Sequence, residues 1–100
     1  MTKKTTILSL AKRIKDKYHP KKIMLFGSYA YGKAKKWSDI DLFVIMNTKK
    51  SLREQAFLIR SEFNETTPID IIVRTPEQVK ERIRMGDYFI KEVMEKGISL

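Results

Sequence analysis

The sequence has 100 residues, no cysteine and a formal net charge of +9 at pH 7. This length is typical of one domain with a modest core, so we expect a single domain over residues 1–100. A hydrophobic content of 42% excludes a disordered chain, and the lack of cysteine excludes disulfides, thiolate metal sites and thiol nucleophiles. No apolar run is long enough for a membrane span or a signal core, so we expect a cytoplasmic protein with no membrane partner.

The positive charge is concentrated in the first half of the chain. Residues 1–50 contain thirteen Lys and Arg against three Asp, whereas residues 51–100 contain eight basic and nine acidic residues. Asp39 and Asp41 therefore lie in positive surroundings, which would attract a nucleoside triphosphate or a nucleic acid. For any single lysine, a solvated surface position is the alternative interpretation.

The first predicted elements are a helix and a strand. Apolar residues at helical spacing predict a helix over residues 5–18, which Thr5 or Thr6 can cap. Pro20 ends this helix, because the residue before a proline avoids the helical conformation. The apolar run 22–26 predicts the first strand.

A Gly-Ser pair follows this strand, and we expect a short helix to start at Ser28. The backbone N–H groups of Gly27 and Ser28 would then bind a phosphate at the helix start. The alternative is a plain strand-to-helix turn in which Ser28 is the N-cap.

A basic loop comes next and contains Lys33, Lys35 and Lys36. These lysines lie beside the predicted phosphate turn, so they are candidate contacts for a triphosphate. We expect the following Trp37 to pack on the core.

Two carboxylates enter the second predicted strand, residues 40–46. Strand alternation places Asp39 and Asp41 on the same face. Two unpaired carboxylates held this close would repel each other, and a divalent cation such as Mg²⁺ removes that repulsion. Metal carboxylates next to a phosphate-binding turn indicate phosphoryl or nucleotidyl transfer.

A third aspartate lies on the third predicted strand, residues 69–73. Alternation puts Asp70 on the face of Ile72, where it interrupts a buried pattern. It is either a third metal ligand or a strand-start carboxylate that reaches a loop amide or Arg74.

The other predicted elements are helical, apart from a short C-terminal edge segment. They are a helix over 51–64 with Ser51 as cap, a helix from the Thr75 capping box to Met85, a helix from Asp87 to Lys96, and an edge segment at 98–100.

These residues resemble a known family. Gly27-Ser28, Gly32 and Ser38-Asp39-x-Asp41 are similar to the Gly-Ser…Asp-x-Asp signature of the DNA polymerase beta-like nucleotidyltransferases. The length is similar to that of its minimal branch, the MntA-type antitoxins encoded beside HEPN-domain ribonucleases. The resemblance implies an α+β fold, with a small mixed sheet of three or four strands and helices packed on one face. The order of elements alone would also allow a small doubly wound sheet.

The resemblance also implies a reaction. Asp39, Asp41 and Asp70 would hold two Mg²⁺ ions, while Gly27 and Ser28 would hold the triphosphate of ATP. AMP would pass to a tyrosine hydroxyl of a partner HEPN ribonuclease, and this would silence the toxin. Many members of the family carry a basic residue at positions equivalent to 29–31, where this chain has Tyr-Ala-Tyr. The charge partner of the triphosphate must then come from elsewhere, for example from the basic loop.

Two other functions stay open at this point. A weak or inactive nucleotidyltransferase-fold antitoxin could act by binding its partner, and the missing basic residue in the turn favours this reading. A basic nucleic-acid-binding module is the other, favoured by the net charge of +9, although the chain has no recognisable recognition helix or aromatic-studded basic strand.

Overall fold

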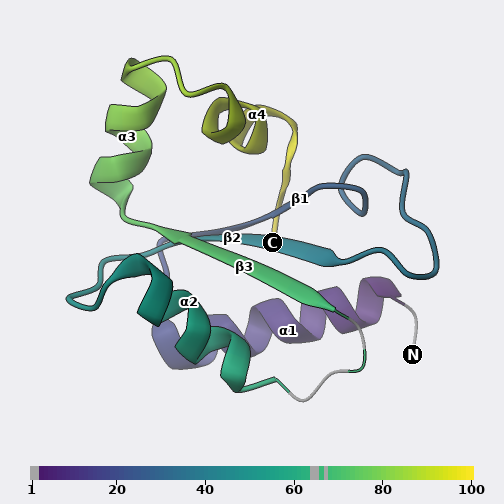
Figure 1. The fold of residues 1–100 in the computed structure, drawn as a ribbon. Coiled ribbons are helices and arrows are strands. Elements are labelled where there is room, and N and C mark those ends of the chain that lie inside the picture. Colours follow the sequence, from purple (N-terminus) through teal and green to yellow (C-terminus); the bar gives the residue numbers. More distant parts are fainter. Residues whose placement is uncertain (1–2, 64–65, 67) are drawn as a thin grey trace.

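The computed structural model describes residues 3–63, 66 and 68–100, and they form four helices and four strands (Figure 1). In chain order these are α1 (Lys3–Tyr18), β1 (Lys22–Phe26), β2 (Ile40–Ile45), α2 (Leu52–Ser61), β3 (Ile69–Arg74), α3 (Pro76–Arg84), α4 (Tyr88–Lys96) and β4 (Ile98–Ser99).

The strands form one mixed sheet in the order β3-β2-β1-β4. β1 is antiparallel to both β2 and β4, whereas β2 and β3 run parallel. Asp41 of β2 pairs with Phe26 on one side and with Asp70 on the other. The expected α+β fold with a small mixed sheet is thus confirmed.

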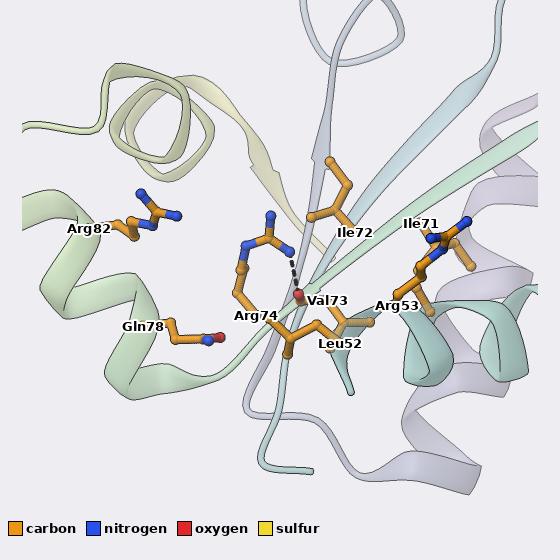
Figure 2. Close-up of a pocket in the computed structure, with 9 residues that line it drawn as sticks. Leu52, Arg53, Ile71, Ile72, Val73, Arg74, Gln78 and Arg82 are labelled. Atoms are coloured by element: carbon orange, nitrogen blue, oxygen red, sulfur yellow. Dashed lines mark hydrogen bonds between the residues drawn. The ribbon is translucent and has the colours of Figure 1, made fainter. Parts of the chain in front are cut away.

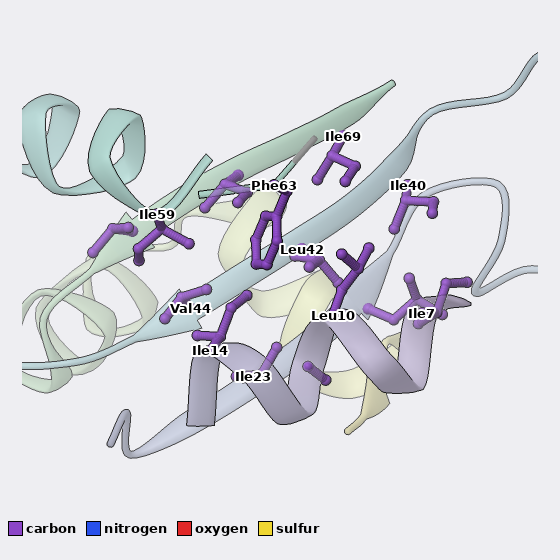
Figure 3. Close-up of a cluster of buried hydrophobic side chains, with 14 of the residues drawn as sticks. Ile7, Leu10, Ile14, Ile23, Ile40, Leu42, Val44, Ile59, Phe63 and Ile69 are labelled. Atoms are coloured by element: carbon purple, nitrogen blue, oxygen red, sulfur yellow. The ribbon is translucent and has the colours of Figure 1, made fainter. Parts of the chain in front are cut away.

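The first face of the sheet is covered by α1 and α2. Leu10 and Ile14 of α1 and Ile59 of α2 are fully buried, and they form one core cluster with Leu42 and Val44 of β2 (Figure 3). The apolar stripe seen in the sequence of α1 is the part of this helix that reaches the sheet.

The second face is covered by α3 and α4, so the expectation that the helices pack on one face is wrong (Figure 1). Val79 of α3 and Ile90 of α4 belong to a second buried cluster with Phe43 and Ile45 of β2. The physical reason is that β2 has buried apolar residues at alternating positions on both faces. If one face lay open, these side chains would be in water.

Three of the four helices begin at the N-cap residue that the sequence predicted. Ser51, Thr75 and Asp87 each accept a hydrogen bond from a backbone N–H of the first turn of α2, α3 and α4. By contrast, α1 already begins at Lys3, so Thr5 and Thr6 lie within it and are not its cap. The predicted end of the second helix at residue 64 lies outside the described residues, and α2 as observed ends at Ser61. In the described part of the chain, no helix has the length and apolar character needed to cross a membrane.

Candidate active site

The three predicted aspartates lie at one end of the sheet. Asp41 and Asp70 are partners in the parallel pairing of β2 and β3, so their side chains leave the same face. Neighbouring strands are about 4.8 Å apart, which makes the two carboxylates direct neighbours. Asp39 comes immediately before β2 and is exposed, as is Asp70, whereas Asp41 is half-buried. Asp70 shares its face with Ile72, as predicted, but it points into solvent rather than into a buried surface.

The charges of the other two aspartates act on Asp41. Burial, followed by the neighbouring charges of Asp70 and then Asp39, raises the pKa of the Asp41 carboxyl from 3.8 to about 6. No Lys or Arg among the described residues forms an ion pair with any of the three. As far as the structure describes the chain, the site therefore concentrates negative charge without a basic ion-pair partner.

This donor set fits a hard divalent cation by its chemistry. Mg²⁺ prefers carboxylate oxygens, and its charge would remove the repulsion that raises the pKa of Asp41. As the side chains stand, no three Asp, Glu, His or Cys residues within 3–63, 66 and 68–100 are arranged to hold an ion directly. Convergence of Asp39, Asp41 and Asp70 on a common ion therefore stays a prediction, and it requires the exposed Asp39 and Asp70 side chains to turn toward Asp41.

Gly27 lies against Asp41. It follows Phe26, the strand partner of Asp41, and its φ of 73° is in the left-handed region that favours glycine. A Cβ built on Gly27 would collide with Oδ2 of Asp41 and lie 3.1 Å from Cγ. Only a glycine leaves the turn this close to the carboxylate.

The segment after Gly27 is a series of turns, so the expectation of a short helix from Ser28 is wrong. The carbonyl of Gly27 accepts hydrogen bonds from the N–H groups of Ala30 and Tyr31, at 3.0 and 3.2 Å, and the carbonyl of Ser28 accepts one from Lys33 at 2.9 Å. Gly27 and Gly32 have left-handed backbone at the two ends of the segment, so a right-handed helix could not extend past either of them. Within the described residues, Ser28 Oγ makes no hydrogen bond, so Ser28 is not a helix cap here.

Within the described residues, no ion pair joins the lysines of the basic loop to the aspartates. Lys33, Lys35 and Lys36 are exposed. Two hydrogen bonds close the loop: the Lys35 N–H donates to Ser38 Oγ at 2.7 Å, and the Ser38 N–H donates to the Lys35 carbonyl at 3.1 Å. The side chain of Trp37 is 77% exposed, which corrects the expectation that it packs on the core. Contact between these lysines and a triphosphate stays a prediction.

Sequence reasoning missed the role of α4 beside the turn. Phe89 of α4 meets Phe26 and Phe43 edge to face, with ring centroids 5.5 and 6.4 Å apart, so this helix packs against β1 and β2 at the end where Phe26 pairs with Asp41. Burial raises the pKa of Tyr31, the Glu92 carboxylate of α4 raises it further, and a backbone hydrogen bond with Gly27 acts in the opposite direction. No local pattern joins residue 31 to residue 92, because their proximity comes from packing alone.

Comparison with known proteins agrees with this arrangement. The family model described as nucleotidyltransferase domain matches residues 7–100. The chain is also similar to the protein named "Putative protein adenylyltransferase MJ0141" of Methanocaldococcus jannaschii. The two are 30% identical over 87 residues, which cover 87% of this chain and 83% of that protein. No solved structure matches the chain significantly.

The family matched by the sequence explains the geometry of the site. Nucleotidyltransferase domains take a nucleoside triphosphate as substrate and typically use a divalent metal, in keeping with a glycine turn packed against neighbouring carboxylates. The chain therefore belongs to the nucleotidyltransferase domain family, and it is a nucleotidyltransferase enzyme.

Proposed function

We propose that this nucleotidyltransferase transfers AMP from ATP to a hydroxyl group of another protein, a tyrosine of a partner HEPN-domain ribonuclease. In this proposal the chain is the antitoxin of a toxin-antitoxin pair, and adenylylation silences the toxin. The observation that carries it is the pairing of Asp41 with Asp70 beside the Gly27-Ser28 turn. The similarity to a protein named as an adenylyltransferase of proteins supports the choice of acceptor.

The roles of the residues follow from their positions. Asp39, Asp41 and Asp70 would hold two Mg²⁺ ions, which when bound supply charge neutralisation for the triphosphate and a lower pKa for the acceptor hydroxyl. The backbone of Gly27 and the unbonded hydroxyl of Ser28 bind and orient the triphosphate. Asp70 is the more exposed of the paired aspartates, so the acceptor approaches from its side.

The reaction is a single displacement at the α-phosphorus. The acceptor oxygen forms a bond to this phosphorus, the bond to the bridging oxygen of the β-phosphate breaks, and pyrophosphate leaves. The hydroxyl proton is released to solvent. The chain contributes position and charge rather than covalent chemistry.

Label transfer from ATP tests the proposal. The chain is incubated with ATP labelled at the α-phosphate and with the protein encoded by the neighbouring reading frame, and the labelled residue is located by mass spectrometry. We expect label on one tyrosine of the partner, lost when that tyrosine is changed to phenylalanine and lost with the Asp41→Asn enzyme. Label at the γ-phosphate serves as the control, because it should leave with pyrophosphate.

A second candidate function is an antitoxin that acts by binding alone. It is favoured by the Tyr-Ala-Tyr sequence in the turn and by the exposed lysines of the basic loop, which form no ion pair with the aspartates within the described residues. The same experiment separates the two. A partner that is inhibited stoichiometrically, without label and equally well by Asp41→Asn, identifies the binding-only antitoxin.

A further inference from the structure

A second feature of the structure is a pocket at the outer edge of the sheet, away from the Gly27-Ser28 turn. It has a volume of about 420 Å³ and lies between α2, β3 and α3. Three arginines line it, one from each element: Arg53, Arg74 and Arg82. Figure 2 shows Arg82 on one side of the end of β3 and Arg53 on the other, with Arg74 between them. The remaining wall is largely apolar and includes Leu52 and Ile71.

The three guanidinium groups have no acidic partner in the described part of the chain. Arg53 and Arg82 are exposed, and within residues 3–63, 66 and 68–100 no ion pair or hydrogen bond involves their side chains. Arg74 donates one hydrogen bond to the backbone carbonyl of Val73 at 2.7 Å, and no carboxylate lines the pocket. A pocket lined by three guanidinium groups and no carboxylate is complementary to an anionic ligand.

The same pocket opens on a free strand edge. β3 is the last strand of the sheet on its side, so one edge of its backbone has no strand partner. The carbonyls of Pro68 and Arg74 face β2, where they accept from Ile40 and Met46. Alternation along the strand then turns the N–H and C=O of Ile71 outward, toward the pocket that Ile71 lines. The outward carbonyls of Ile69 and Val73 already accept hydrogen bonds from the side chains of Arg60 and Arg74. Ile71 is therefore the position at which this edge can take an added strand.

We propose that the free edge of β3, together with Arg53, Arg74 and Arg82, binds an extended acidic segment of the acceptor protein. The segment adds to β3 through backbone hydrogen bonds at Ile71, and its carboxylates meet the three arginines. This inference rests on the proposed function, and it names how the substrate is recognised. Arg74 and Asp70 are four residues apart on one strand, which is about 13 Å at the usual rise. A segment of the acceptor protein that is docked on this edge would therefore place its acceptor hydroxyl on the side of Asp70.

The mixed character of the pocket favours a peptide over a nucleic acid. Outward backbone N–H and C=O groups pair with another backbone and not with a sugar-phosphate chain. The apolar wall would accommodate the alternate side chains of an added strand, and none of the residues that line the pocket is an aromatic on which a base could stack.

Peptide binding tests the inference directly. The probe is a short fluorescein-labelled peptide in which glutamate alternates with valine around one tyrosine, and its affinity is measured by fluorescence anisotropy. In the variant Arg53→Glu/Arg82→Glu we expect the affinity to fall roughly tenfold or more, because both charges are reversed in the pocket. The matched control is Lys80→Glu/Lys91→Glu, which changes the net charge equally on exposed positions outside the pocket and should stay within about twofold of wild type. A peptide with N-methylated backbone amides should also bind more weakly than the unmodified probe.

The outcomes separate this inference from the proposed function. Equal affinity in the two double variants, or no binding of the probe to the wild-type chain, overturns the docking surface while label transfer to the partner can still be observed. Loss of peptide affinity in Arg53→Glu/Arg82→Glu supports it even where no label is transferred. If a single-stranded oligonucleotide binds more tightly than the peptide and loses as much affinity in that variant, the pocket is a nucleic-acid site and the inference is wrong.

Discussion

Gly27 and Asp41 lie so close that no side chain can be added between them. A Cβ on Gly27 would collide with the Asp41 carboxylate, and the φ of 73° at Gly27 is itself unfavourable for other residues. The turn that we expect to bind the triphosphate and the carboxylate that we expect to bind metal are thus held in direct contact.

This contact predicts the effect of Gly27→Ala. The variant should lose about 2 kcal/mol of unfolding free energy and most of its ATP affinity, since the new methyl group displaces Asp41. Gly32→Ala is the matched control, because Gly32 has a φ of 72° but no atom within 4 Å of an added Cβ. It should lose about 1 kcal/mol of unfolding free energy and keep its ATP affinity. Urea unfolding and calorimetry measure both, and an equal loss of ATP affinity in the two variants would contradict the contact.

The raised pKa of Asp41 predicts that, in the absence of divalent cations, the protein loses stability as the pH rises. Its folded-state pKa of about 6 is above the value of 3.8 for an unperturbed carboxyl, so the folded state binds the proton more tightly. Its contribution to stability is present at low pH and is lost as the pH rises through about 6. Asp41→Asn should therefore be more stable than wild type at neutral pH with EDTA, and Asp16→Asn, at a distant exposed site, should not. A wild-type and an Asp41→Asn profile that run parallel in urea unfolding would refute this.

The paired aspartates should differ in their effect on binding and on transfer. Asp70→Asn should bind Mg²⁺-ATP within about threefold of wild type while AMP transfer falls roughly a thousandfold or more, since only the acceptor side is affected. Asp41→Asn should lose both. Calorimetry and single-turnover transfer measured together decide it. Near wild-type transfer by Asp70→Asn would make Asp70 a structural strand residue.

Ser28 should affect the nucleotide but not the fold. Its hydroxyl makes no hydrogen bond within the described residues, so Ser28→Ala should leave the unfolding free energy unchanged. It should weaken ATP binding by about 1 kcal/mol, the value of one hydrogen bond to a charged phosphate. Unchanged affinity by calorimetry would remove Ser28 from the nucleotide site.

The basic loop should act on the rate of nucleotide association. Replacing Lys33, Lys35 and Lys36 with serine should slow association of ATP and flatten its dependence on salt, because exposed charges steer ligands at a distance. Stopped-flow measurements at low and high salt test this. Equal association rates at low salt would assign the three lysines to an ordinary solvated surface.

The sequence by itself determined the local features of this protein. The spacing of Asp39 and Asp41 before an apolar strand, the caps at Ser51, Thr75 and Asp87, and the apolar runs of β1 and β2 could all be recognised from their periods and residue types. These features depend on residues within a few positions of one another, and side-chain alternation or capping chemistry specifies them.

Only the tertiary structure decided which of these elements meet. The pairing of Asp41 with Asp70, the helices on both faces, and the approach of Glu92 to Tyr31 join residues far apart in the chain. The same holds for the arginine pocket, to which α2, β3 and α3 each contribute one guanidinium group. The alternation of side chains along a strand assigns Asp70 to one face of β3, but it does not say which strand lies beside it. Strand order and register result from burying both apolar faces of the sheet at once.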